Sequence, residues 1–124
     1  MRLDFHGASV RAARDRIRGA LRDRCPDTRL DDARLVVSEL VANSLRYAEP
    51  LDDHTITVGW SLRTDVLRVS VTDGGSMTSV PNPRRPEDLA TGGRGLKIVQ
   101  ALAERWGVDR KGGGTTVWAE LSLH

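Results

Sequence analysis

Cysteine is almost absent from this sequence of 124 residues. Cys25 stands alone, so no internal disulfide can form, and we expect a protein of the reducing cytoplasm. His6, His54 and His124 lie far apart along the chain, with no cysteine cluster near them. The usual ligands of a zinc site are therefore not grouped, and we expect none.

Long apolar runs are also missing. No segment approaches the length of a membrane span, and residues 1–6 do not contain the apolar core of a signal peptide. We therefore expect no membrane contact. A chain of this length suits one compact domain with its own core, so we predict a single domain over residues 1–124.

The chain has little excess charge. Its formal net charge is +2, and acidic residues interleave with the arginines. A basic edge is expected on one face of the first predicted helix, at Arg11, Arg14, Arg18 and Arg22. A solvated helix face explains this edge best, and nucleic acid is not an expected partner.

Hydrophobic periodicity divides the first half of the chain into a strand and two helices. Residues 2–6 alternate as a short edge strand. Ser9 is predicted to cap a helix that runs to about Arg24. Asp31 or a neighbour is predicted to cap a second helix, which Pro50 prevents from continuing.

The second half is rich in strands. The predicted elements are strands at 56–62 and 67–73 with a turn at 63–65, a helix at 95–105, and strands from 106 and over 115–123 with a turn at 111–114. Three prolines exclude a helix from most of residues 74–93, so this stretch is predicted to be a functional loop. The pattern predicts an α+β two-layer sandwich, a mostly antiparallel sheet with helices on one face.

Two polar residues interrupt the apolar side of the second helix. Glu39 and Asn43 are four residues apart and stack on one helix face. The Asn43 amide oxygen suits magnesium, which needs few protein ligands, and Glu39 could accept a proton from an attacking hydroxyl. The alternatives are an Asn43 satisfied by backbone, and a Glu39 at the surface or paired with Arg46 or Arg94.

Asp73 ends the strand that carries Val69 and Val71 and shares their face, because side chains alternate along a strand. It is therefore predicted to point toward the helices, where a carboxylate needs hydrogen-bond donors. The exocyclic amine of adenine is a suitable donor, and Gly75 would let the ring approach the backbone closely. The alternative is an ordinary Asp-Gly turn at a strand end.

Glycines also mark the start of the last helix and the last strand. Gly93, Gly95 and Leu96 open the helix, where free backbone N–H groups face an anion. Thr115 and Thr116 follow a glycine into the strand, where a hydroxyl could touch a base. Each signal is weak alone, since glycines also mark ordinary loops.

Together, these four pieces resemble the GHKL ATP-binding superfamily, which includes gyrase, sensor histidine kinases and mismatch-repair ATPases. Residues 39–43 are similar to its N box, 73–75 to its first glycine box, and 93–96 to its second. The resemblance implies a Bergerat-type fold, ATP and Mg²⁺ as cofactors, Asn43 as the metal ligand and Glu39 as the base. It implies nucleotide contacts from Asn43, Asp73, Gly75, Gly93, Arg94, Gly95, Leu96, Thr115 and Thr116.

Residues 93–107 and 116–121 are similar to small bacterial anti-sigma factors of the serine-protein-kinase type. Members of that family bind ATP, phosphorylate a serine on an anti-anti-sigma protein and sequester a sigma factor. The resemblance implies those two partners, a possible homodimer, and a partner contact near Arg46, Arg84, Arg85 and Arg94. A sensor histidine kinase is expected less, because these 124 residues leave no room for dimerisation helices.

A second reading is a nucleotide-binding switch protein that sequesters a partner without phosphotransfer. Two departures from the superfamily pattern favour it: Met77 stands where another glycine is usual, and the loop is short and proline-rich. A third departure is Tyr47, which stands where many relatives have histidine. The intact Glu39 favours the kinase.

Overall fold

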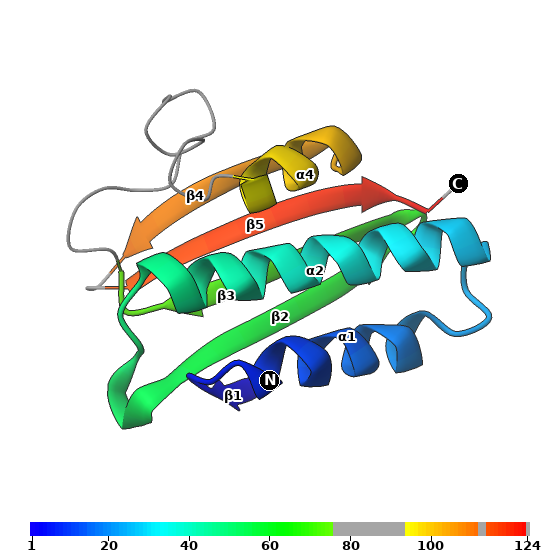
Figure 1. Cartoon of the computed structure of the whole chain (residues 1–124). Helices are drawn as coiled ribbons and strands as arrows, with labels where there is room; N and C mark the ends of the chain where they lie inside the picture. Colours follow the sequence, from blue (N-terminus) through cyan, green and yellow to red (C-terminus); the bar gives the residue numbers. More distant parts are fainter. Residues whose placement is uncertain (76–93, 112–113, 124) are drawn as a thin grey trace.

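The computed structural model describes residues 1–75, 94–111 and 114–123, and it has two layers (Figure 1). Helices cover one face of an antiparallel sheet, which confirms the predicted α+β sandwich. The elements are β1 (Arg2–Asp4), α1 (Ala8–Leu21), α2 (Asp27–Tyr47), the 3-10 turn η1 (Asp52–His54), β2 (Thr55–Arg63), β3 (Val66–Asp73), α4 (Arg94–Leu102), β4 (Arg105–Lys111) and β5 (Gly114–Ser122).

The sheet has the order β1-β2-β3-β5-β4, and every neighbouring pair is antiparallel. Strands β2 and β3 form a hairpin in which Arg63 pairs with Val66, so residues 64–65 make the turn. Strand β5 lies between β3 and β4, and its register places Thr115 opposite Asp73. This order brings the end of β3 and the start of β5 to the same end of the sheet.

The core lies between the sheet and the helices. Alternate residues of β3 and β5 are buried there, as their period-two pattern predicts. Helix α2 contributes the longest buried face and lies between α1 and α4 (Figure 1). The largest fully buried side chains are Ile17, Leu21, Leu40, Ile56, Leu67, Leu96 and Leu121.

The start of α1 differs from the prediction. The helix begins at Ala8 after Gly7, and Ser9 is not its cap. The Ser9 side chain is buried, and its hydroxyl donates a hydrogen bond to the backbone carbonyl of Asp4. Ser9 therefore links the helix to β1, because a buried hydroxyl needs a hydrogen-bond partner and the Asp4 carbonyl can accept a second bond.

The predicted ends of two helices, and one predicted start, were also wrong. Helix α1 ends at Leu21, because Arg22 leaves the helical region with a ψ of 129° and Asp23 then adopts a positive φ of 63°. Helix α2 begins at Asp27, directly after Pro26, where a proline fits and an acid favours the helix start. Helix α4 ends at Leu102, since the chain then joins β5 through a backbone hydrogen bond from residue 104.

Most of the predicted loop, residues 76–93, lies outside the described residues. The expectations for Met77, Arg84, Arg85 and Gly93 fall in this stretch and stay predictions. Across the described ranges, none of the helices combines the length and the apolar character that crossing a bilayer requires.

Candidate functional site

A buried carboxylate connects the sheet to α2. Asp73 is 4% exposed and points toward the helices, as predicted from its place on β3. The Ser44 hydroxyl on α2 donates a hydrogen bond of 2.6 Å to its Oδ2. The backbone N–H of Gly75 donates one of 2.8 Å to its Oδ1. The chain itself therefore supplies donors to both carboxylate oxygens.

Burial raises the pKa of Asp73 above its ordinary value of 3.8, while the hydrogen bonds from Ser44 and Gly75 act in the opposite direction. Each carboxylate oxygen has a second lone pair, so both oxygens can still accept a further hydrogen bond. The group is thus held in one orientation and keeps acceptor capacity for a ligand.

The two glycines after Asp73 tie the strand end to the segment that follows α2. The N–H of Gly74 donates to the Glu49 carbonyl at 2.7 Å, and the N–H of Glu49 donates to the Gly75 carbonyl at 2.9 Å. Gly75 has a φ of 94°, which side-chain-bearing residues rarely adopt. The Asp-Gly-Gly sequence therefore fixes the geometry around the carboxylate.

Gly74→Ala is expected to lower the free energy of unfolding by about 1–3 kcal/mol, the usual cost of overpacking. A Cβ at this position would lie 2.3 Å from the carbonyl oxygen of Pro50 and 3.0 Å from that of Glu49. Both are backbone atoms, so the strand end must move and strain its two hydrogen bonds. Urea denaturation measures the change.

Gly19→Ala is the matched control, because Gly19 lies on α1 and a Cβ there meets no atom within 4 Å. We expect it to stabilise the protein by about 0.5–1 kcal/mol, since alanine is the better helix former. Equal effects of the two substitutions would contradict the proposed close contact at Gly74.

Asn43 directly precedes Ser44 on α2 and is 7% exposed. Within the described ranges, no hydrogen bond to its side-chain amide is present. The alternative prediction, in which the Asn43 amide forms a hydrogen bond with the backbone, is therefore not observed among the described residues. Among the described residues, the fully buried side-chain polar atom without a partner is Nε of Arg34, so the Asn43 amide still reaches the surface and is accessible to a ligand.

The donor set around Asn43 fits magnesium. Among the described residues there is no group of three or more His, Cys, Asp or Glu side chains placed to hold a metal. An all-protein cage is not what Mg²⁺ requires: it keeps waters and binds through one or two protein oxygens plus phosphates. One amide oxygen from Asn43 is enough for a magnesium ion that a phosphate group also binds.

Glu39 is half-buried, one turn before Asn43. It lines a depression of about 450 Å³ on the helical layer, together with residues of α1 and α2 that include Val10 and Arg14. No ion pair joins Glu39 to Arg46 in the part of the chain that the structure describes. The side chain of Arg94, the other predicted partner of Glu39, lies outside the described residues.

The two candidate threonines lie on opposite faces of the sheet. Thr115 is buried, pairs with Asp73 across β3 and β5, and shares its face. Thr116 pairs with Thr72, and their hydroxyl oxygens lie 2.7 Å apart. The structure therefore brings Thr115 to the carboxylate and places Thr116 on the face without helices.

Helix α4 begins at Arg94 and includes Gly95 and Leu96. The first four N–H groups of a helix have no partner inside it and favour an anion. The Leu96 side chain is in the core, so any contact it makes with a ligand is through its backbone.

Sequence analysis missed the role of Ser44. Ser44 lies on the buried face of α2, and its hydrogen bond to Asp73 was not predicted. The signal was available: a buried carboxylate needs a donor, and Ser44 is the hydroxyl on the helix face that packs on that strand.

Comparisons with known proteins address the family. The family model described as the histidine kinase-like ATPase domain matches residues 5–121. No curated protein matches the chain. A structure of the RsbU and RsbW domains of Rv1364c from Mycobacterium tuberculosis is similar, with a TM-score of 0.69 and 19% identity over 99% of this chain and 32% of that one.

Two histidine kinases are similar in fold. The histidine kinase domain of the blue-light activated histidine kinase EL346 from Erythrobacter litoralis has a TM-score of 0.56 and 23% identity, over 94% of this chain and 60% of that one. The histidine kinase AdeS from Acinetobacter baumannii has a TM-score of 0.52 and 18% identity, over 100% of this chain and 67% of that one.

This chain thus spans about a third of the first of these structures and less than two thirds of the second. At these identities the likeness concerns the fold alone. The family match covers nearly the whole chain. The chain belongs to the histidine kinase-like ATPase domain family, which confirms its resemblance to the GHKL superfamily.

Proposed function

We propose that the chain is a Mg²⁺- and ATP-dependent protein serine/threonine kinase that acts as an anti-sigma type transcription regulator, with an anti-anti-sigma protein as its phosphate acceptor. The observation that carries the proposal is the buried Asp73 carboxylate, which Ser44 and Gly75 hold in one orientation and which keeps acceptor capacity for a ligand. The ATPase family match and the fold shared with an RsbW-containing structure support it.

In this proposal, Asp73 recognises the adenine base. Its carboxylate accepts a hydrogen bond from the exocyclic amine, and Ser44 and Gly75 hold it in the accepting orientation. Guanine presents a carbonyl where adenine has the amine, so it would place two acceptors against each other. Thr115, on the same face, is the threonine placed to assist.

The phosphates would lie between Asn43 and the start of α4. Asn43 would hold Mg²⁺, which neutralises phosphate charge when it is bound. The free N–H groups at residues 94–97 would bind phosphate oxygens. Gly93 belongs to the same predicted phosphate-binding segment and lies outside the described residues.

Glu39 is the proposed general base. It would accept the proton of the acceptor serine hydroxyl as the hydroxyl oxygen bonds to the γ-phosphorus and ADP leaves with the electrons of the broken bond. Its position one turn from the magnesium ligand is suited to this task.

A binding switch without phosphotransfer is the second candidate. It is supported by the absence, in the described ranges, of a hydrogen bond or ion pair that would orient the Glu39 carboxylate. In either case the expected partners are an anti-anti-sigma protein and a sigma factor, in the cytoplasm, with a possible homodimer. Arg46 is exposed and stays a candidate contact.

A nucleotide titration tests the proposal. Calorimetry with ATP and Mg²⁺ is expected to give saturable binding that weakens without the metal. GTP should bind about 5- to 150-fold more weakly, because an unmade buried hydrogen bond costs about 1–3 kcal/mol. Equal affinities for ATP and GTP would contradict the role of Asp73.

Phosphotransfer is then measured with radiolabelled ATP and a candidate anti-anti-sigma protein. The kinase proposal expects label on a serine of that protein. ATP binding that is accompanied by tight partner binding but no label on any tested partner favours the switch.

A further inference from the structure

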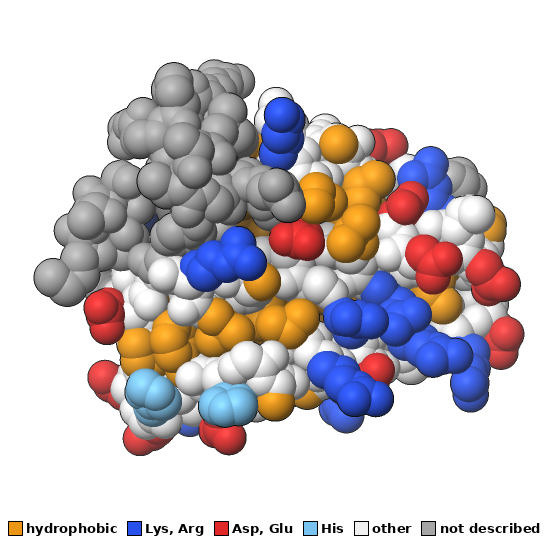
Figure 2. All heavy atoms as spheres, viewed as in Figure 1, with side chains coloured by type: hydrophobic (Ala, Val, Ile, Leu, Met, Phe, Trp, Pro, Cys, Tyr) orange, Lys and Arg blue, Asp and Glu red, His pale blue; other side chains and the backbone are white. Residues whose placement is uncertain are grey.

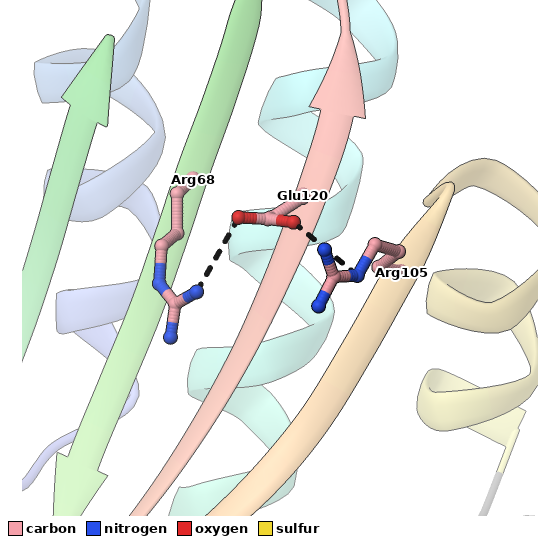
Figure 3. A network of polar contacts seen from close by, with 3 residues as sticks. All are labelled: Arg68, Arg105 and Glu120. Atoms are coloured by element: carbon pink, nitrogen blue, oxygen red, sulfur yellow. Dashed lines mark hydrogen bonds and ion pairs between the residues drawn. The ribbon is translucent and has the colours of Figure 1, made fainter. Parts of the chain in front are cut away.

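A charged cluster lies on the face of the sheet that the helices leave uncovered (Figure 3). Arg68 on β3, Glu120 on β5 and Arg105 on β4 share one row of the register. Glu120 binds both arginines: its Oε2 lies 3.3 Å from Nη1 of Arg68, and its Oε1 lies 3.7 Å from Nε of Arg105. The glutamate therefore sets the spacing of two guanidinium groups.

Trp118 holds the same cluster from the neighbouring row. The guanidinium carbon of Arg68 lies 4.2 Å from the centre of its ring, and that of Arg105 lies 5.9 Å away. The ring lies close over β4 at Gly107, where an added Cβ would meet it at 2.7–2.9 Å. Stacking and ion pairing together leave Arg68 little freedom, so it would lose little entropy on binding a partner.

A cavity of about 520 Å³ opens beside this cluster, near the β2–β3 turn. Its lining residues are Ser61, Arg63, Thr64, Val66, Arg68 and Glu120. The cavity volume lies in the usual range of binding sites. It is separate from the proposed nucleotide site, because Asp73 points to the other face of the same sheet.

The cavity lining and the ion-pair cluster together carry an excess of positive charge. They contain three arginines, Arg63, Arg68 and Arg105, and one acid, Glu120. Arg63 is exposed, and none of the ion pairs among the described residues includes it. Carboxylates are the natural complement, since a guanidinium group binds them through two parallel hydrogen bonds.

The spacing of the arginines indicates the size of the partner. Arg63 and Arg105 belong to β2 and β4, which β3 and β5 separate. Three strand spacings amount to about 14 Å, and Arg63 lies two residues along the strands from the row of Arg105, so their Cα atoms are about 16 Å apart. One carboxylate or phosphate cannot bridge that distance, whereas carboxylates four residues apart on one side of an extended peptide are about 13–14 Å apart, within reach of two long arginine side chains.

We propose that this open face is a docking site for an acidic, extended segment of a protein partner, bound by Arg63, Arg68 and Arg105. The segment crosses the strands at the β2–β3 end of the sheet. The site does not depend on the proposed nucleotide chemistry, so the domain can hold a partner on one face while its other face binds a ligand.

A hexaglutamate peptide is the probe, titrated into the ¹⁵N-labelled full chain and followed by NMR. Saturable shifts are expected at Arg68, Glu120 and the indole N–H of Trp118. Arg63→Glu with Arg105→Glu should weaken binding at least 10-fold. The milder pair Arg63→Gln with Arg105→Gln should also weaken it, and circular dichroism of both variants checks the fold.

The matched control makes the same charge change on the helical layer. Figure 2 shows Lys and Arg side chains gathered there, and Arg11 and Arg18 are exposed residues of α1. Arg11→Glu with Arg18→Glu should leave the peptide affinity within about twofold. Equal weakening by both charge-reversed pairs means general attraction of acidic peptide to a basic protein and overturns the proposal.

Two further outcomes also overturn it. Citrate or inorganic phosphate that produces the same shifts with the affinity of the peptide identifies a small-anion site instead. Shifts at Trp118 and Glu120 that grow with protein concentration, without peptide, identify a second copy of the chain as the occupant of this face.

Discussion

Asp73→Asn is expected to weaken ATP binding about 10- to 150-fold, while the nucleotide-free protein becomes more stable at neutral pH. The loss of affinity corresponds to about 1.5–3 kcal/mol for a hydrogen bond to a charged group. Asparagine has the shape of aspartate and can still accept from the Gly75 N–H and pair with the Ser44 hydroxyl. It removes the buried charge.

The gain in stability follows from the direction of the pKa shift. Burial raises the pKa of Asp73 above 3.8, so the folded protein holds this proton more tightly than the unfolded chain does. The stabilisation of the folded state by this proton is complete below pH 3.8 and is lost as the pH rises through the raised pKa of Asp73. At higher pH the buried carboxylate carries its full desolvation cost, which asparagine lacks.

Thermal melts from pH 4 to pH 8 measure this effect. The melting temperature of the Asp73→Asn variant minus that of the wild type is expected to increase with pH and then level off. Asp109→Asn is the control, because Asp109 is exposed on β4 and its substitution should change neither Tm nor ATP affinity. A variant that is less stable than the wild type at pH 7 would refute the desolvation argument.

Much of the fold could be predicted because its information is local. The alternation of Val69, Val71 and Asp73 correctly predicted which face of β3 is buried and that the carboxylate points toward the helices. The N-box and glycine-box order predicted the family, because the spacing of such motifs follows the order of elements that carry them.

Contacts between distant segments could not be read in this way. Ser44 and Asp73 are 29 residues apart, and their hydrogen bond depends on how α2 packs on the sheet. The hydrogen bonds between Glu49 and the two glycines depend on the path of the chain after α2, which brings Glu49 to the end of β3. The predicted helix starts were also wrong. The helices begin directly after Gly7 and Pro26, whereas the more usual capping residues Ser9 and Asp31 predicted later starts.

The open-face cluster was the hardest feature to foresee. Arg68, Arg105 and Glu120 carry no motif, and their period-two positions indicate a face but not its neighbours. The sheet order places β5 between β3 and β4, and only this order puts one glutamate between two arginines. Strand order is a property of the whole chain.

Glu39→Gln and Asn43→Ala are expected to separate chemistry from binding. Both residues lie on α2, one turn apart, but Glu39 would accept a proton, whereas Asn43 would bind a metal. Glu39→Gln should lower the phosphotransfer rate about 10²- to 10⁴-fold, the usual contribution of a general base, and leave the Kd for ATP within twofold. Asn43→Ala should make ATP affinity insensitive to Mg²⁺, because the amide that holds the metal is gone.

Calorimetry with and without Mg²⁺, together with radiolabel transfer, distinguishes these outcomes. Glu104→Gln is the matched control, since Glu104 is exposed and lies after α4, away from Asn43. It should change neither quantity. A Glu39→Gln variant that transfers phosphate at the wild-type rate would show that Glu39 is not the base. If Asn43→Ala keeps the full magnesium dependence, the metal is held elsewhere and Asn43 is not its ligand.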